Sequence, residues 1–79
     1  MRISVRAFNE AARFTAHLPP EGTLHLAGNA TVQAVFDALT LPAGVQANLV
    51  VFRNGRPAAP ETKIGDDDRL VLFAPMSGG

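Results

Sequence analysis

Residues 1–8 read MRISVRAF, and apolar side chains alternate with polar ones through most of this stretch. A period of two places successive side chains on opposite faces of a strand, so residues 1–8 predict a half-buried β-strand. Residues 70–73 read LVLF and predict a second, strongly apolar strand near the other end of the sequence. Both strands are therefore candidates for the centre of one sheet.

The segment that follows the first strand predicts a turn and a partner strand. Residues 9–17 have a mixed pattern that indicates a loop or a short irregular helix. Pro19-Pro20-Glu21-Gly22 is a turn signal, and residues 23–26 alternate again. We expect residues 23–26 to pair with the first strand as a hairpin.

One main helix is predicted in the middle of the chain. Thr31 is its expected N-cap, because a threonine hydroxyl can accept a hydrogen bond from the first free backbone amides. Pro42 and Gly44 are expected to end the helix. Its buried face is expected to consist of the apolar residues that recur at helical spacing, Val32, Val35, Phe36 and Leu39.

The second half of the chain predicts two more strands besides residues 70–73. Residues 47–52 form a short, nearly continuous apolar run, which favours a strand buried on both faces. Asn54-Gly55 is a hairpin signal because both residues tolerate positive φ, and Pro57, which has no amide proton, indicates an edge strand at 56–59. The order of elements predicts an α+β protein, a β-grasp sheet of four to five strands with one main helix, in a single domain over residues 1–79.

The composition excludes several classes of function. Seven basic residues balance seven acidic ones, so nothing indicates binding to nucleic acid or to an anionic membrane. The sequence has no cysteine, which excludes disulfides and thiol nucleophiles. No apolar run reaches membrane-spanning length, and residues 1–8 do not resemble a signal peptide, so we expect a cytoplasmic protein.

The side chains form no recognisable catalytic or metal-binding pattern. His17 and His25 lack the spacing of a helical metal pair. The three consecutive carboxylates of residues 66–68 predict a solvated turn, because neighbouring carboxylates in a turn cannot converge on one cation. Arg13 and Arg53 are expected to be ordinary surface residues. We therefore predict no metal site and no bound cofactor.

The last residues carry the remaining signal. Residues 75–79 read PMSGG and predict a flexible tail, because glycine loses the most conformational freedom when it is ordered. The order of elements, the Asn54-Gly55 hairpin, the acidic turn and the ending from Phe73 to Gly79 resemble the ubiquitin-like sulfur carriers of bacteria and archaea, the MoaD/ThiS type. Within that family the chain most resembles the small subunit of molybdopterin synthase. Relatives commonly have glycine in the middle of the acidic turn, where this chain has Asp67, a residue type that tolerates left-handed backbone.

The resemblance implies a carrier rather than an enzyme. An adenylyltransferase resembling ubiquitin-activating enzyme would use ATP to adenylate the carboxylate of Gly79, and sulfur from a persulfide donor would convert it into a thiocarboxylate. The large subunit of molybdopterin synthase, or another sulfur-acceptor enzyme, would then receive the sulfur. Gly78 and Gly79 suit a tail that threads a narrow channel, because no Cβ blocks the approach of the backbone. Pro75 would end the sheet pairing and direct the tail away from the body.

A hypothesis about the partner surface follows from the strand pattern. If Leu70 and Leu72 face the helix, a period of two places Val71 and Phe73 on the opposite face of the sheet, and Phe8 points outward in the same way. An exposed apolar patch on so small a protein usually marks a partner site. The expected partner-binding residues are Phe8, Val71, Phe73, Pro75, Met76 and Ser77.

Two alternatives to the molybdopterin role remain open at this stage. The first keeps the carrier chemistry and changes the pathway, to thiamin thiazole, cysteine or another thio-metabolite. The second is a ubiquitin-like modifier that is joined to lysines, or a β-grasp interaction module with an idle tail.

Overall fold

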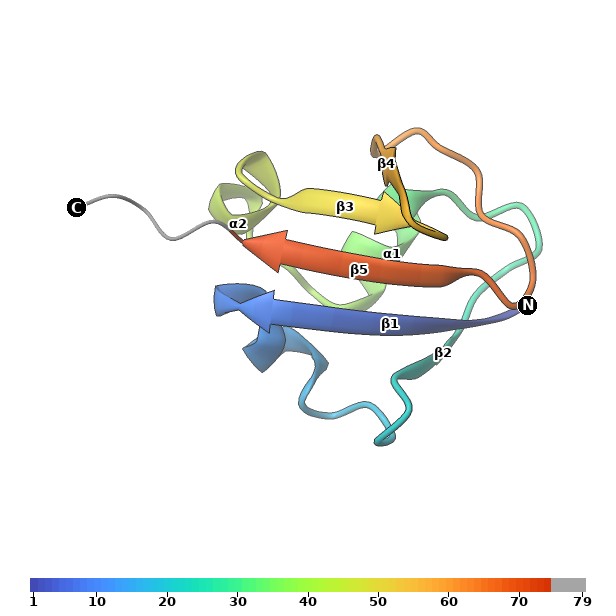
Figure 1. Cartoon of the computed structure of the whole chain (residues 1–79), viewed down its shortest axis with the longest axis horizontal. Coiled ribbons are helices and arrows are strands. Elements are labelled where there is room, and N and C mark those ends of the chain that lie inside the picture. Colours follow the sequence, from blue (N-terminus) through green and yellow to red (C-terminus); the bar gives the residue numbers. More distant parts are fainter. Residues whose placement is uncertain (75–79) are drawn as a thin grey trace.

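The computed structural model describes residues 1–74, whose five strands form one mixed sheet in the order β2-β1-β5-β3-β4 (Figure 1). The predicted flexible tail, residues 75–79, lies outside the described residues. This sheet, with α1 packed across one face, confirms the predicted α+β, β-grasp arrangement. The elements in chain order are β1 (Arg2–Asn9), the 3₁₀ helix η1 (Glu10–Thr15), β2 (Thr23–His25), α1 (Val32–Ala38), α2 (Ala43–Ala47), β3 (Val50–Arg53), β4 (Arg56–Ala58) and β5 (Arg69–Ala74).

The two strands with the strongest apolar patterns lie side by side at the centre of the sheet. β1 and β5 run parallel, in a register that extends from Ser4 opposite Arg69 to Asn9 opposite Ala74. Their inward side chains form the middle of the core, and burial of each full aliphatic side chain contributes roughly 1.5–3 kcal/mol to folding. The most deeply buried of these side chains, each at most 2% exposed, are Ile3, Val5, Leu70 and Leu72.

The buried face of α1 is the one that the helical spacing predicts. Its side chains pack against the central strands: Val32, Val35, Phe36 and Leu39. Thr31 occupies the N-cap position as expected, but its hydroxyl makes no capping hydrogen bond. The first amides of the helix donate instead to backbone carbonyls of the loop before β5, from Val32 to Thr62 and from Gln33 to Pro60, at 2.9 Å each. The start of α1 is therefore held by this loop rather than by a side chain.

The prediction for Pro42 and Gly44 was wrong. α1 already ends at Ala38, and Pro42 is the N-cap of a second short helix, α2, which contains Gly44. The physical reason is that an N-cap residue needs no amide proton for the helix, so a proline can precede one. α1 itself ends earlier because Thr40 adopts a positive φ of 58° and the Leu41 amide donates back to the Phe36 carbonyl at 3.1 Å. No helix among residues 1–74 has the length and the apolar character needed to span a membrane.

The strand expected at residues 47–52 is shorter and less buried than predicted. Residue 47 belongs to α2, and β3 begins only at Val50. Val51 is buried, whereas Val50 is 39% exposed, because no helix covers the second face of the sheet. The hairpin at Asn54-Gly55 and the edge position of β4, which contains Pro57, are confirmed.

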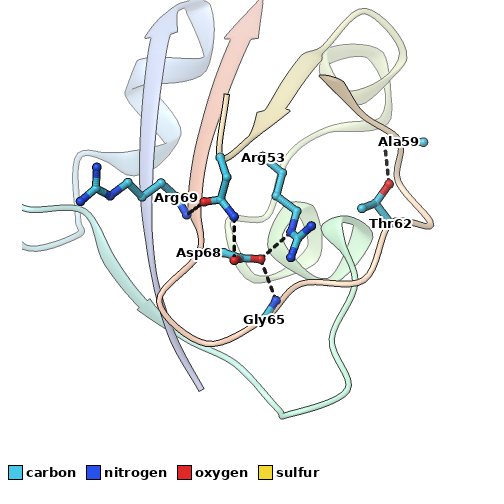
Figure 2. Close-up of polar contacts among 7 residues, drawn as sticks. Arg53, Ala59, Thr62, Gly65, Asp68 and Arg69 are labelled. Carbon is cyan, nitrogen blue, oxygen red and sulfur yellow. Dashed lines mark hydrogen bonds and ion pairs between the residues drawn. The ribbon is translucent and has the colours of Figure 1, made fainter. Parts of the chain in front are cut away.

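The acidic turn before β5 is organised around one buried carboxylate, which corrects the prediction of a solvated turn. Asp68 is only 7% exposed, and Figure 2 shows its contacts. Its carboxylate accepts hydrogen bonds from the Gly65 amide at 2.7 Å, from Asn54 Nδ2 at 2.9 Å and from Arg53 Nε. Asn54 Oδ1 in turn accepts from the Arg69 amide at 2.9 Å. Arg53, expected to be an ordinary surface residue, therefore helps to fix the β3–β4 hairpin to the turn before β5, and Asn54 fixes the hairpin to Arg69, the first residue of β5.

The other two carboxylates of the turn are exposed, as predicted. Asp67 adopts the left-handed conformation expected of it, with φ at 64°, and its amide donates to the Arg2 carbonyl at 2.7 Å. Asp66 Oδ1 accepts from the Arg2 amide at 2.8 Å. The turn is therefore also attached to the beginning of β1.

The environment of Asp68 sets the direction of its pKa shift. Burial by itself raises the pKa, but the hydrogen bonds from Gly65 and Asn54, together with the hydrogen bond and positive charge of Arg53, outweigh burial and hold the pKa below its ordinary value. A carboxyl group whose pKa is lowered by folding stabilises the protein when it is ionised. That contribution is complete above the pKa of the unfolded chain and disappears as the pH falls through the pKa of the folded state.

We expect Asp68→Asn to lower the free energy of unfolding by about 2 kcal/mol at neutral pH, because an amide cannot accept all three hydrogen bonds or pair with Arg53. The difference in stability between variant and parent begins to narrow near the pKa of the unfolded carboxyl, at about pH 4, and disappears as the pH falls through the lower pKa of the folded state. Urea denaturation at neutral and acidic pH measures both effects. The matched control is Asp67→Asn, since its ion pair with Arg2 at 3.8 Å is exposed and worth less than about 0.5 kcal/mol. Equal stability of the two variants at neutral pH contradicts the assignment.

A second constraint on the fold is the turn that the sequence predicts before β2. Gly22 has φ at 73°, and its carbonyl accepts a hydrogen bond from the Val5 amide at 2.9 Å. A Cβ at this position would lie 2.1 Å from the Val5 carbonyl oxygen, a backbone atom of the central strand. The chain can approach β1 this closely only because residue 22 has no side chain.

Gly22→Ala and Gly55→Ala distinguish two reasons for a glycine, a positive φ and a close approach to another part of the backbone. Gly55 also has positive φ, at 84°, but an added Cβ there meets nothing within 4 Å. We expect Gly55→Ala to destabilise the protein by about 1 kcal/mol, from backbone conformation alone. Gly22→Ala adds a clash with β1 and is expected to destabilise by about 3 kcal/mol or more. Thermal and urea denaturation measure the difference, and equal losses contradict the close approach.

Candidate functional site

The candidate site is the face of the sheet that α1 does not cover, which we call the open face. Three large apolar side chains lie on it with substantial exposure: Phe8 at 49%, Phe73 at 40% and Val50 at 39%. The strand register places Phe8 opposite Phe73 and Phe73 opposite Val50. Phe8, Phe73 and Val50 therefore form one continuous row across β1, β5 and β3, which we call the apolar row.

A second row lies beside it on the open face. Val71 is half-buried there, between Arg6 of β1 and Phe52 of β3 in the register. The strand pairing therefore confirms that Phe8, Val71 and Phe73 lie on the open face, as predicted. Their contact with a partner stays a prediction.

The apolar row lies at one end of the central strands. β1 and β5 are parallel, so their carboxyl ends meet at the same edge, and Phe8 and Phe73 are each one residue from the end of their strand (Figure 1). Ala74, which follows Phe73, is the last described residue. The remaining predicted site residues follow it in the sequence and lie outside the described residues: Pro75, Met76, Ser77, Gly78 and Gly79.

Val50 is a member of the apolar row that the sequence prediction missed. An apolar run such as residues 49–52 shows no alternation, so its inward and outward positions cannot be distinguished from the pattern alone. The usable signal was the hairpin at Asn54-Gly55, which fixes the register of β3 and hence the side on which Val50 lies.

The open face also carries two cations away from the apolar row. Arg6 and Arg69 are exposed: Arg6 lies opposite Val71 on β1, and Arg69 lies two residues before Val71 on β5. The ion pairs among residues 1–74 are Arg2 with Asp67 and Arg53 with Asp68, so neither Arg6 nor Arg69 has an acidic partner within this part of the chain. An exposed apolar patch next to unpaired charges is the composition expected of a protein-binding surface.

The described residues offer no catalytic centre to compete with this surface. No group of three or more histidine, aspartate or glutamate side chains within residues 1–74 is placed to hold a metal ion. Asp68 is the one buried acid among them, and its oxygens are occupied by the hydrogen bonds described above.

The sheet order, the covering helix and the open face define a ubiquitin-like protein of the β-grasp class. The profile of the ThiS family matches residues 5–79, and the chain belongs to this family of small sulfur carriers. No curated protein matches the sequence.

Similar solved structures share this fold, but the proteins are named for different roles. SAMP1 of Haloferax volcanii, a small archaeal modifier protein, is 28% identical over the full length of both chains, with a TM-score of 0.76. A protein named molybdopterin converting factor subunit 1, from Pyrococcus furiosus, is 15% identical over 96% of this chain and 99% of its own, with a TM-score of 0.73. The thiamine biosynthesis protein ThiS of Geobacter metallireducens is 18% identical over both full chains, with a TM-score of 0.64. The latter two similarities concern the fold alone.

Proposed function

We propose that this chain carries sulfur as a thiocarboxylate on Gly79 and that it serves molybdopterin biosynthesis. The observation that carries the proposal is the family match over residues 5–79, which includes both terminal glycines. The position of the apolar row supports it, because a partner bound there sits beside the end of β5, from which the segment to Gly79 continues. The chain then needs no catalytic side chains of its own.

The proposed chemistry makes the carboxylate of Gly79 into a good acyl donor. An oxygen of this carboxylate attacks the α-phosphorus of ATP in the activating enzyme, pyrophosphate leaves, and an acyl-adenylate forms. The terminal sulfur of a persulfide donor then displaces AMP from the acyl carbon. A thiol cleaves the resulting sulfur–sulfur bond and leaves the thiocarboxylate, which an acceptor enzyme consumes. ATP is thus a substrate of the partner and not a cofactor of this chain.

The choice of pathway has its own support. The ending from Phe73 to Gly79 is the part of the sequence that most resembles the small subunit of molybdopterin synthase, and the Pyrococcus furiosus protein supports the shared fold. The large subunit of molybdopterin synthase is then the acceptor. A thiamin thiazole carrier uses the same activation with a different acceptor, and the ThiS family match supports that alternative equally.

A ubiquitin-like modifier is the second candidate, and the 28% identity to SAMP1 supports it. A modifier and a sulfur carrier share the acyl-adenylate, and they differ in the nucleophile that displaces AMP: a persulfide in one case, a lysine amine in the other. The products therefore distinguish the two functions even though the fold does not.

The first test follows the chemistry at Gly79. We expect incubation with ATP, the cognate adenylyltransferase and a sulfur donor to replace one oxygen by one sulfur, and intact-mass spectrometry with fragmentation measures the change and locates it at Gly79. A variant with one residue added after Gly79 is the control and stays unmodified, because a misplaced reacting group loses the proximity advantage. An unmodified parent in the presence of an active adenylyltransferase overturns the carrier proposal, and adducts on lysines of other proteins establish the modifier instead.

The second test follows docking on the open face. We expect Phe73→Asp to weaken binding to the activating and acceptor enzymes by about 2 kcal/mol, or roughly thirtyfold in Kd, because it places a charge in the centre of the apolar row. Titration calorimetry measures the affinity, and circular dichroism checks that the fold is retained, since Phe73 is 40% exposed. Asn29→Asp makes the same change of charge in an exposed turn before α1 and serves as the control. Parental affinity of Phe73→Asp for both enzymes rules out the apolar row as their shared binding surface.

A further inference from the structure

The turn between β3 and β4 consists of a chemically reactive pair of residues, Asn54 and Gly55. Both residues are exposed, and both have positive φ, at 52° and 84°. When glycine follows asparagine, its backbone nitrogen can attack the side-chain amide of the asparagine with little steric obstruction, because glycine has no Cβ. The residues that suit the hairpin turn are therefore also residues that can react with each other.

The folded structure holds the side chain of Asn54 away from this reaction. Asn54 Nδ2 donates to Asp68 Oδ1 at 2.9 Å, and Asn54 Oδ1 accepts from the Arg69 amide at 2.9 Å; Figure 2 shows these contacts of Asp68 and Arg69. The backbone amide of Asn54 also donates to the Arg69 carbonyl at 2.8 Å. For Cγ of Asn54 to approach the Gly55 nitrogen, the carboxamide must rotate and give up both of its hydrogen bonds. The contacts that fix the hairpin to β5 therefore also suppress the reaction.

The reaction is a deamidation, and water is its co-reactant. The Gly55 nitrogen loses its proton and forms a bond to Cγ of Asn54, and the side-chain nitrogen leaves as ammonia. Water then opens the cyclic imide at one of its two carbonyl carbons. Opening at Cγ leaves an aspartate at position 54. Opening at the backbone carbonyl leaves an isoaspartate, whose main chain is longer by one carbon.

Both products are incompatible with the contacts around Asp68. The carboxyl of Asp68 is 7% exposed, and its hydrogen bonds and Arg53 hold its pKa below the ordinary value, so it is ionised at neutral pH. An aspartate at position 54 lacks the Nδ2 donor and places a negatively charged oxygen close to Asp68 Oδ1, where the two charges repel. An isoaspartate also lengthens the turn, whereas the register of β3 with β4 requires a two-residue loop.

We propose that Asn54 is a site of spontaneous deamidation that the fold suppresses, and that its modification releases the β3–β4 hairpin from the beginning of β5. Opening of the hairpin exposes Asn54 to the reaction, and the reaction favours the open hairpin. Modification and loss of structure therefore reinforce each other. The modification involves neither Gly79 nor a partner enzyme, so its test is independent of the proposed function.

The first experiment measures where and how fast the chain deamidates. The parent is incubated at mildly alkaline pH, in native buffer and in denaturing urea, and peptide mass spectrometry locates the conversion of amide to acid. We expect Asn54 to react in urea and to react more slowly in native buffer by roughly tenfold or more, because the folded chain must first break both hydrogen bonds. Asn29 and Asn48, which precede alanine and leucine, are the internal controls and stay unmodified over the same period.

Gly55→Ala provides the matched control for the chemistry. Its Cβ obstructs the attacking nitrogen, so Asn54 is expected to react more slowly than in the parent even in urea. An Asn54 that remains intact in urea rules out the site. Equal rates in native buffer and in urea rule out suppression by the fold.

The second experiment measures the consequence of the modification. Asn54→Asp reproduces one product, and Asn54→Gly removes the same hydrogen bonds without adding a charge, in a residue that suits positive φ. At neutral pH we expect the folding equilibrium constant of Asn54→Asp to be lower than that of Asn54→Gly by roughly tenfold or more, because of repulsion from Asp68. The neighbouring cations, Arg53, Arg56 and Arg69, are the same in both variants.

Urea denaturation at neutral and acidic pH measures these equilibrium constants. The additional loss in Asn54→Asp is expected to disappear at acidic pH, where the carboxyl groups are protonated and no longer repel. Equal stability of Asn54→Asp and Asn54→Gly at neutral pH refutes the proposed effect of the modification. An additional loss that is the same at both pH values refutes repulsion as its cause.

Discussion

The parallel pairing of β1 with β5 is the constraint on which the rest of the structure depends. It joins the first strand to the last, and its inward side chains form the middle of the core. Parallel strands need a long connection, and here the connection supplies α1, the cover of one face of the sheet. The same pairing brings the carboxyl ends of both strands to one edge, which is why Phe8 lies beside Phe73 and Asn9 beside Ala74. The candidate site is therefore a direct result of the topology.

β5 is held at both ends by side chains from other strands. At its beginning, Asp68 receives hydrogen bonds from Arg53 and Asn54, which belong to the β3–β4 hairpin. At its end, the Ala74 carbonyl accepts from Asn9 of β1. A domain of 79 residues has a small core and a narrow margin of stability, so polar contacts that fix the ends of the central strand matter more than they would in a larger protein. β5 is thereby fixed at both ends, from Arg69 to Ala74, the last described residue.

The sequence predicts those features that depend on local pattern, and it fails where tertiary contacts decide. Alternation in residues 1–8 and the hairpin signal at Asn54-Gly55 correctly predict strands and their faces, because period and turn chemistry are local properties. Pro42 was predicted to end a helix and instead precedes one, because proline is compatible with both positions. The burial of Asp68 could not be seen because its partners come from a hairpin that is adjacent only in the fold. The positive φ of Asn9 could not be predicted, because the sequence does not specify the backbone conformation of a single residue.

The division of roles between body and terminus explains why one fold serves both sulfur carriers and modifiers. In the proposed function the body contributes a binding surface and a fixed origin for the segment that follows Ala74, and all bonds are made and broken at Gly79. The acyl-adenylate is common to both roles, so the body faces the same task in each, which is to bring the terminal carboxylate to ATP in an activating enzyme. What distinguishes the roles is the nucleophile that the next partner supplies, a sulfur or an amine. In the proposed function that partner binds the open face, where the apolar row lies near the exposed side chains of Arg6 and Arg69.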